Sequence, residues 1–194
     1  MANQPTPPNR RSVRIPEYDY AIEGSYFVTV CTHGKACTLG RLVHAHIEPS
    51  ALGKLTRDCW QQIPNHFESV TLDEYIVMPN HLHGIIVKWS DAGTACRAPT
   101  DPRDPGVAFT PIVKEGRTQE KFGVPVVASL ATIIRSFKSA VTKAARQRRL
   151  WQNKPLWQRG YYEHIIRQSE SLEEIRQYIQ RNPFRWAELY YSFS

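Results

Sequence analysis

Two histidines separated by a single leucine, His81 and His83, have the residue types and the spacing of a metal-binding pair. The segment that follows is rich in β-branched residues and predicts a strand, and alternate side chains of a strand point to the same face. Both imidazoles would then lie on one face while Leu82 enters the core. Neutral imidazoles are good ligands for a divalent ion. The alternative is the polar start of a strand with two exposed histidines, which the pattern alone does not separate from a metal site.

Tyr178 and Asn182 form a second candidate pair. They are four residues apart in a segment with helical periodicity, so they lie one above the other on the same helical face. A tyrosine can act as a covalent nucleophile when a metal or a base assists it. Taken singly, Tyr178 is also explained as an aromatic residue at the edge of the core, and Asn182 as the N-cap of a new helix that begins at Pro183. The face borders an apolar stripe that would shelter the pair partly against a sheet: Leu172, Ile175 and Ile179.

The elements that must position these residues can be predicted from residue type and periodicity. Runs of β-branched and aromatic residues indicate strands, and apolar spacings of three and four indicate helices. A tight turn at Pro79-Asn80 should join two of the strands. The predicted strands are residues 26–32, a short one within 40–48, 75–78, 82–87 and 157–167, and the predicted helices are 51–63, 130–149 and 171–181.

The capping-box pattern of Ser171 and Glu174 marks the start of the last helix, and Asn182-Pro183 is expected to interrupt it. A further helical piece would follow over 184–190. The order strand, helix, hairpin, helix, strand, helix predicts an α+β fold, with an antiparallel sheet and helices packed mainly on one face.

The domain organisation follows from composition. Residues 1–16 read as a basic, loosely ordered arm, and 17–194 as a single domain with a Pro-rich inserted loop at about 90–127. The chain carries a net charge of +7, which favours a polyanionic partner but is also common among soluble proteins. The basic side chains predicted to contact phosphates of such a partner are Arg10, Arg11 and Arg14 on the arm and Arg135, Lys138, Arg146 and Arg149 on the 130–149 helix. The helix alone is equally well explained by a solvated polar face.

Localisation is predicted from what the chain lacks. No apolar run has the length of a membrane span, and the first residues lack the apolar centre of a signal peptide. The four cysteines are scattered and are expected to be buried thiols of a reducing compartment. A cytoplasmic protein without a membrane partner is therefore expected.

Five ordered segments together resemble the single-tyrosine HUH transposases, in particular the REP-associated tyrosine transposases of bacteria. The resemblance spans about residues 11–186 and is broken only by the Pro-rich insertion. It is far more specific than a histidine pair alone. The segments that carry it are Tyr26-Phe27-Val28-Thr29, Met78-Pro79-Asn80-His81-Leu82-His83-Gly84, Phe137-Lys138-Ser139-Ala140-Val141-Thr142, residues 157–167, and Tyr178-Ile179-Gln180-Arg181-Asn182-Pro183.

The resemblance implies a ferredoxin-like sheet with the histidine pair on a central strand. His81 and His83 match the family's ligands for Mg²⁺ or Mn²⁺, and Tyr178 matches its nucleophile. Asn182 matches the polar residue that completes the metal site, where transposases of mobile insertion sequences more often carry Gln. The implied activity is cleavage and rejoining of single-stranded or hairpin DNA such as REP elements, through a 5′-phosphotyrosine intermediate, by a monomer or a homodimer.

Other functions are compatible with parts of this pattern. A domesticated protein could bind hairpin DNA and cut it poorly or not at all, although all four candidate site residues are retained. A phosphoesterase that uses activated water would need carboxylate ligands, and the predicted hairpin offers only Asp73 and Glu74. An RNA-binding module would be expected to carry an aromatic ribonucleoprotein motif, which is absent. Tyr161 and Tyr162 are rival nucleophiles, of which one should face the core and the other water.

Overall fold

The computed structural model describes residues 23–43, 46–89, 129–152, 154–167 and 172–191. The N-terminal arm with Arg10, Arg11 and Arg14, the 90–127 insertion and the capping-box residue Ser171 lie outside these residues, so the predictions made for them stay predictions.

A four-stranded antiparallel sheet forms the centre of the molecule. Its strands are β1 (Gly24–Cys31), β4 (Val70–Val77), β5 (His81–Lys88) and β6 (Tyr162–Ile166), arranged in the order β4-β5-β1-β6. The chain order β1, helix, β4-β5 hairpin, helix, β6 is the ferredoxin-like arrangement. It places β1 and β5 in the middle of the sheet and β4 and β6 at its edges. The predicted fold class is confirmed.

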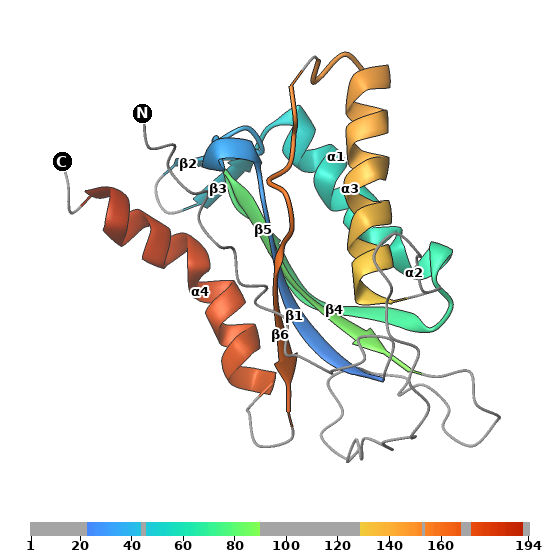
Figure 1. Ribbon diagram of the computed structural model, residues 1–194. Coiled ribbons are helices and arrows are strands. Elements are labelled where there is room, and N and C mark those ends of the chain that lie inside the picture. The colour runs from blue at the N-terminus through green and yellow to red at the C-terminus, as the bar shows by residue number, and fades with distance from the viewer. Residues whose placement is uncertain (1–22, 44–45, 90–128, 153, 168–171, 192–194) are drawn as a thin grey trace, which may run out of the picture.

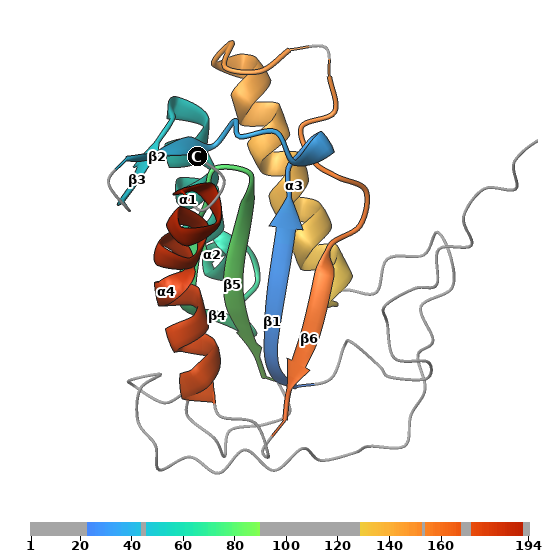
Figure 2. The ribbon, with the colours of Figure 1, turned by 90° about the vertical axis from the view of Figure 1, so that its left-hand side faces the viewer.

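Helices cover both faces of the sheet (Figures 1 and 2). On one face lie α1 (Ala51–Gln61), the short α2 (Ile63–His66) and α3 (Leu130–Gln147), which together make up most of the helical cover. The last helix, α4 (Leu172–Tyr191), lies alone on the opposite face, where Figure 2 shows it on the β4 side of the sheet. The molecule is therefore layered as helices, sheet and a single helix.

The alternation of side chains along the strands fills two separate cores. Tyr26, Val28 and Val30 of β1 point to the α1–α3 face, where they join the large core cluster with residues of both helices. Phe27 points the other way and packs with Ile85 of β5 and Ile179 of α4 in a smaller cluster. Burial of these apolar side chains, at about 25 cal/mol per Å², is what holds α4 on its face of the sheet.

The predicted short strand within 40–48 is a hairpin of two strands, β2 (Gly40–Val43) and β3 (His46–Pro49), which pair with each other and not with the main sheet. A single turn of 3₁₀ helix, η1 (His33–Lys35), precedes it. Helix α1 ends at Gln61, and Pro64 lies in the first turn of α2, where its missing N–H would have no partner in any case.

The prediction that Asn182-Pro183 interrupts the last helix is wrong, because α4 continues through Pro183 to Tyr191. A proline in a helix removes one backbone hydrogen bond and crowds the preceding turn. Contacts on both sides of Pro183 hold the helix on the sheet despite this cost: Ile179 is fully buried, and Ala187, one turn beyond the proline, is 8% exposed.

The predicted strand over 157–167 is shorter than expected. Only Tyr162–Ile166 forms β6, and before it Trp157 makes an isolated bridge with Thr32. Gly160 interrupts the extended chain because its φ of 75° is left-handed, a conformation that glycine adopts without strain. The expectation of buried thiols holds only in part, because Cys31 and Cys59 are half-buried whereas Cys37 is exposed. No helix within the described residues is long and apolar enough to span a membrane.

Candidate functional site

The histidine pair lies at the start of β5, on the face of the sheet that α4 covers. His81 pairs in register with Cys31 and His83 with Thr29, so the pair occupies a central strand with β1 beside it. The Nε2 atoms of the two rings face each other at 2.9 Å. His83 is only 6% exposed. The prediction that both imidazoles share one face is confirmed. The alternative of two exposed histidines is wrong, because His83 is buried.

The other ring nitrogen of each histidine has its own hydrogen-bond partner. The Asn80 side-chain oxygen lies 2.6 Å from Nδ1 of His81, and because an amide oxygen can only accept, His81 donates from Nδ1. The Thr29 hydroxyl lies 2.8 Å from Nδ1 of His83 and can either donate or accept. These partners fix the orientation of both rings and leave the Nε2 atoms turned toward each other.

Burial keeps both imidazoles neutral. Desolvation lowers the pKa of His81 from 6.5 to about 4, and the positive charge of Lys35 adds to the effect. Desolvation likewise lowers the pKa of His83 from 6.5 to about 3, with a further contribution from His81. A protonated imidazolium would have to lose a proton to the solvent before it could bind a metal ion, whereas these neutral rings need only carry their one proton on Nδ1.

Polar contacts place α4 over the histidines. Arg176 donates to both carboxylate oxygens of Asp73 on β4, with its closest contact at 2.7 Å, and the two side chains are 15% and 8% exposed. One turn further along, Gln180 donates to Glu74 at 3.2 Å. The only two carboxylates of the β4–β5 hairpin are therefore engaged with α4, which makes them poor candidates for the ligands that a water-activating phosphoesterase would need.

This docking brings Tyr178 next to the histidine pair. The Tyr178 ring lies 5.5 Å from the His83 ring and 5.9 Å from the Phe27 ring, both measured between centroids and both edge-to-face. The side chain stays 38% exposed, so a phosphate from solution can reach it. The Arg185 guanidinium lies 5.4 Å above the same ring.

Asn182 is buried one turn beyond Tyr178, on the inner side of α4. It is 7% exposed, and its side-chain amide makes no hydrogen bond to another described residue. The next turn carries Trp186, whose ring lies 5.6 Å from that of His81. The hypothesis that Asn182 caps a new helix is wrong because it lies inside α4, and a buried amide without such a partner is free to serve as a ligand.

The donor set fits a six-coordinate divalent ion. Adjacent ligands of an octahedral ion with bonds of about 2.1 Å are about 3.0 Å apart. The 2.9 Å between the two Nε2 atoms is close to that value, so their separation suits two adjacent ligands of one ion. Within the described residues no cluster of three or more His, Cys, Asp and Glu side chains could hold a metal ion. A third protein ligand would therefore come from an amide such as that of Asn182, and the substrate would supply further oxygens.

The four basic residues predicted on the 130–149 helix are dispersed by the structure. Arg135 is exposed near the start of α3, whereas Arg146 lies in a groove at its other end. Arg149 lies beyond the end of the helix, with φ of 55°. Lys138 donates to the carbonyl oxygens of Gln158, at 2.8 Å, and Gly160, so its ammonium holds the segment before β6 and does not project into solvent.

The rival tyrosines separate as expected, with Tyr161 packed partly against the core and Tyr162 46% exposed. Tyr162 is on the α4 face, 6.3 Å from the Phe27 ring, and so lies close to the candidate site. Four residues that shape this site were given no role in it from the sequence: Thr29, Asn80, Phe27 and Trp186. Asn80 could have been found as the neighbour of His81, whereas Thr29 is 54 residues from His83 and only the strand register brings it there.

The fold and the site define a ferredoxin-like α+β protein in which a tyrosine on the last helix faces a histidine pair on a central strand. The chain belongs to the same family as an uncharacterized protein of Haemophilus influenzae, with which it shares 37% identity over 178 residues, covering 92% of this chain and 90% of the relative. No protein-family model matches the chain.

Among solved structures, the chain is similar to a REP-associated tyrosine transposase bound to a REP hairpin. The TM-score is 0.52 at 16% sequence identity, over 90% of this chain and 74% of the transposase. At this level of identity the similarity shows a shared fold, which agrees with the fold predicted from the sequence.

Proposed function

We propose that this protein cleaves and rejoins single-stranded DNA, with Tyr178 as the nucleophile and a divalent ion held by His81, His83 and Asn182. The observation that carries the proposal is the position of Tyr178, a partly exposed tyrosine whose ring lies 5.5 Å from that of a buried, neutral histidine. The shared fold with a tyrosine transposase supports it.

Each proposed ligand is suited to Mg²⁺ or Mn²⁺ by its chemistry and its surroundings. His81 and His83 would offer their Nε2 atoms, which are neutral and face each other, and Asn182 would offer its buried amide oxygen. When bound, the ion would polarise the scissile phosphate and neutralise the charge that develops on its oxygens.

The reaction assigned to Tyr178 is a transesterification. Its hydroxyl oxygen attacks phosphorus and forms a 5′-phosphotyrosine bond, while the bond from phosphorus to the 3′ oxygen breaks. The phenol gives up one proton and the departing 3′ oxygen takes up one, so that a free 3′-OH results. No water is consumed and one phosphodiester replaces another, so the 3′-OH of a second strand can reverse the step and rejoin the DNA.

The expected substrate is a DNA hairpin with a single-stranded flank. Cleavage requires a strand without a complement, because the backbone of a duplex would not bend into a site between α4 and the sheet. The net charge of +7 favours a polyanion. The transposase of the same fold is bound to a REP hairpin, which is why palindromic elements of this kind are the first substrate to test.

The nucleophile is tested with Tyr178→Phe and with Tyr162→Phe as the matched control, because both tyrosines are exposed on the same face. A labelled hairpin oligonucleotide is incubated with Mn²⁺ and run on a denaturing gel. Wild type and Tyr162→Phe should yield a covalent protein–DNA adduct, and Tyr178→Phe should yield none while binding the hairpin equally well. An adduct that persists in Tyr178→Phe, and that mass spectrometry maps to Tyr161 or Tyr162, would show that the nucleophile is misassigned.

The metal requirement is tested in the same assay. His81→Ala, His83→Ala and addition of EDTA should each abolish the adduct. Full activity of the wild type in EDTA would rule out the proposed mechanism. If the wild type binds hairpins but forms no adduct with either Mn²⁺ or Mg²⁺, the protein is a hairpin-binding protein and not a nuclease.

A further inference from the structure

Helix α4 carries three arginines whose charges are used differently. Arg176 is committed to carboxylates, since it pairs with Asp73 at 2.7 Å and with Glu173 at 3.6 Å. Arg181 and Arg185 are exposed, and neither forms a hydrogen bond or an ion pair within the part of the chain that the structure describes. Arg185 instead places its guanidinium 5.4 Å from the centre of the Tyr178 ring.

Helical geometry explains why Arg185 and not Arg181 reaches this ring. Seven residues are nearly two turns, so Arg185 lies within about 20° of Tyr178 around the helix axis, whereas Arg181, three residues on, lies about 60° away. Side chains of a helix lean toward its N-terminus, which directs Arg185 back over the turns before it. The two arginines therefore differ in their relation to Tyr178, although both put one positive charge on the same helix.

The contact with the ring leaves the guanidinium free to bind an anion. The face of an aromatic ring attracts a cation by its electron density and accepts no hydrogen bond that the cation must give up elsewhere. All five N–H donors of Arg185 thus remain available to an oxyanion. Phe27 and His83 pack edge-to-face against the same ring, and 38% of Tyr178 stays open to solvent.

The proposed transesterification needs positive charge at this position. Attack of the Tyr178 oxygen makes phosphorus five-coordinate, and negative charge then accumulates on the two non-bridging oxygens. When the step is reversed, the Tyr178 oxygen departs with negative charge. A preorganised cation beside the nucleophile stabilises both charges as they develop.

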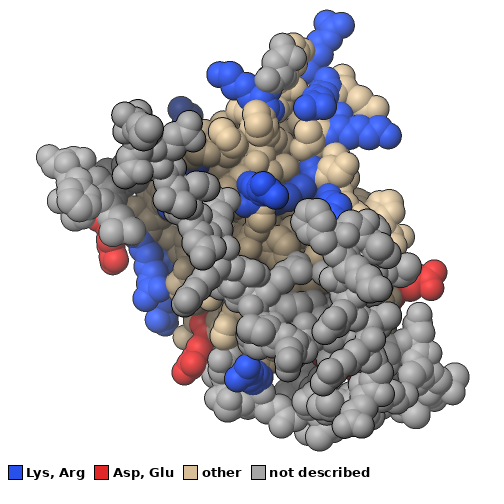
Figure 3. Space-filling model, viewed as in Figure 1, with Lys and Arg blue, Asp and Glu red and all other residues tan. Residues whose placement is uncertain are grey.

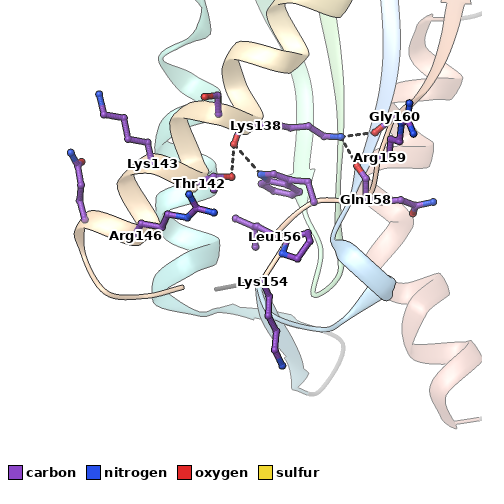
Figure 4. A pocket seen from close by; sticks show the side chains of 13 residues that line it. Lys138, Thr142, Lys143, Arg146, Lys154, Leu156, Gln158, Arg159 and Gly160 are labelled. Carbon is purple, nitrogen blue, oxygen red and sulfur yellow. Dashed lines mark hydrogen bonds between the residues drawn. The ribbon is translucent and has the colours of Figure 1, made fainter. Parts of the chain in front are cut away.

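The other cations of the molecule are placed differently. In Figure 3 the Lys and Arg side chains gather at the top, where Figure 1 places the C-terminal end of α3, on the face of the sheet opposite to α4. Among them, Lys138 is held by the carbonyls of Gln158 and Gly160 (Figure 4). On the site's own side, the positive charge of Lys35 acts on His81.

We propose that Arg185 is a catalytic residue, whose guanidinium binds a non-bridging oxygen of the scissile phosphate and stabilises the charge that develops there and on the Tyr178 oxygen. Arg185 keeps its proton throughout, so the bonds that form and break are those of the transesterification alone. This assignment rests on the proposed function and adds to it a residue outside the nucleophile and the three ligands.

The test measures how fast the covalent adduct forms. Full-length protein in excess over a labelled hairpin with a single-stranded flank is mixed with saturating Mn²⁺, and the adduct is followed with time on denaturing gels. Arg185→Lys keeps the charge, whereas Arg185→Met removes it and keeps an unbranched side chain that packs well on an aromatic ring. Arg181→Met is the matched control on the same helix, and Lys35→Met tests the other cation near the histidines.

Arg185→Met should form the adduct about 100-fold more slowly than the wild type. This is the lower end of the loss of about 10²–10³-fold for one preorganised donor, as expected for an exposed side chain. Arg185→Lys should lie between the two, because an ammonium keeps the charge but not the planar fork. Arg181→Met should keep the wild-type rate. Hairpin binding in EDTA should be the same for all proteins, since the stabilised charge exists only in the transition state.

Rejoining provides a second measurement on the same variants. Adduct is isolated, a strand with a free 3′-OH is added, and the loss of adduct is timed. Arg185→Met should slow this step by a similar factor, because both directions pass through one transition state.

A wild-type rate for Arg185→Met would overturn the assignment. So would an equal loss in Arg181→Met, a loss in Arg185→Lys as large as in Arg185→Met, or a loss in Lys35→Met alone. A weakening of hairpin binding in EDTA that matches the loss of rate would reduce Arg185 to a binding contact. If the wild type forms no adduct, the proposed function fails and this assignment with it; if it forms one through Tyr178 while Arg185→Met is as fast, only the role of Arg185 is wrong.

Discussion

Thr29 is expected to control the metal affinity of the site, although it is not itself a proposed ligand. Its hydroxyl lies 2.8 Å from Nδ1 of His83, which is 6% exposed, so little water can replace it. When Nε2 of His83 binds a metal ion, the ring proton must be on Nδ1, and the Thr29 hydroxyl is placed to accept it. Without a metal, the same hydroxyl can donate to Nδ1 while His83 shares its Nε2 proton with His81.

Thr29→Val preserves the shape of the side chain and removes the hydroxyl. Losing a hydrogen-bond partner of this kind typically costs about 10–100-fold in metal affinity, or about 1.4–2.7 kcal/mol. Isothermal titration with Mn²⁺ should show this loss, and the adduct assay should recover activity at raised Mn²⁺. Thr29→Ser is the matched control, since it keeps the hydroxyl and should bind Mn²⁺ nearly as well as the wild type.

The reasoning would be refuted by a Thr29→Val variant with wild-type Mn²⁺ affinity. It would also be refuted if Thr29→Ser were as impaired as Thr29→Val, because the methyl group and not the hydroxyl would then be responsible. Binding of hairpin DNA in EDTA should be the same for all three proteins, which separates an effect on the metal from an effect on DNA.

Three further predictions concern stability. Burial holds the folded-state pKa of His81 at about 4 and that of His83 at about 3, below the ordinary 6.5, so the unfolded chain binds more protons between these values and 6.5. The free energy of unfolding should therefore fall as pH drops from about 6.5 to about 4. Urea titrations should show this fall, and a less steep one in a His81→Gln, His83→Gln double variant. Gly84→Ala would place Cβ 2.4 Å from Cζ2 of the buried Trp60, and should cost about 1–3 kcal/mol, seen as a Tm lowered by about 2–4 °C per kcal/mol; an unchanged Tm would mean that the indole moves freely. Pro183→Ala restores a backbone donor inside α4 and should raise stability by about 1–2 kcal/mol, whereas a lower Tm would indicate that the proline ring packs in a way the helix needs.

The sequence by itself determined the local geometry of each half of the site. A strand period of two places His81 and His83 on one face, and a helical spacing of four places Tyr178 and Asn182 on another, whatever surrounds them. Amphipathic periodicity likewise predicted α1 and α3. These features depend on residues a few positions apart, and such contacts form the same way wherever the segment packs.

Only the tertiary structure decided how the two halves meet. That α4 covers the histidine face follows from contacts more than 90 residues apart in sequence: Ile179 is buried against Phe27 and Ile85, and Arg176 pairs with Asp73. Burial of Ile179 and Ala187 on either side of Pro183 carries the helix through the proline, where local propensity predicted a break. Two hydrogen-bond partners also could not be predicted from the sequence. Thr29 meets His83 through strand register, and Lys138 binds two carbonyls of a segment 20 residues away instead of facing solvent. A sequence specifies which faces are apolar, but which of two apolar faces a helix covers depends on the summed burial and pairing across the whole fold.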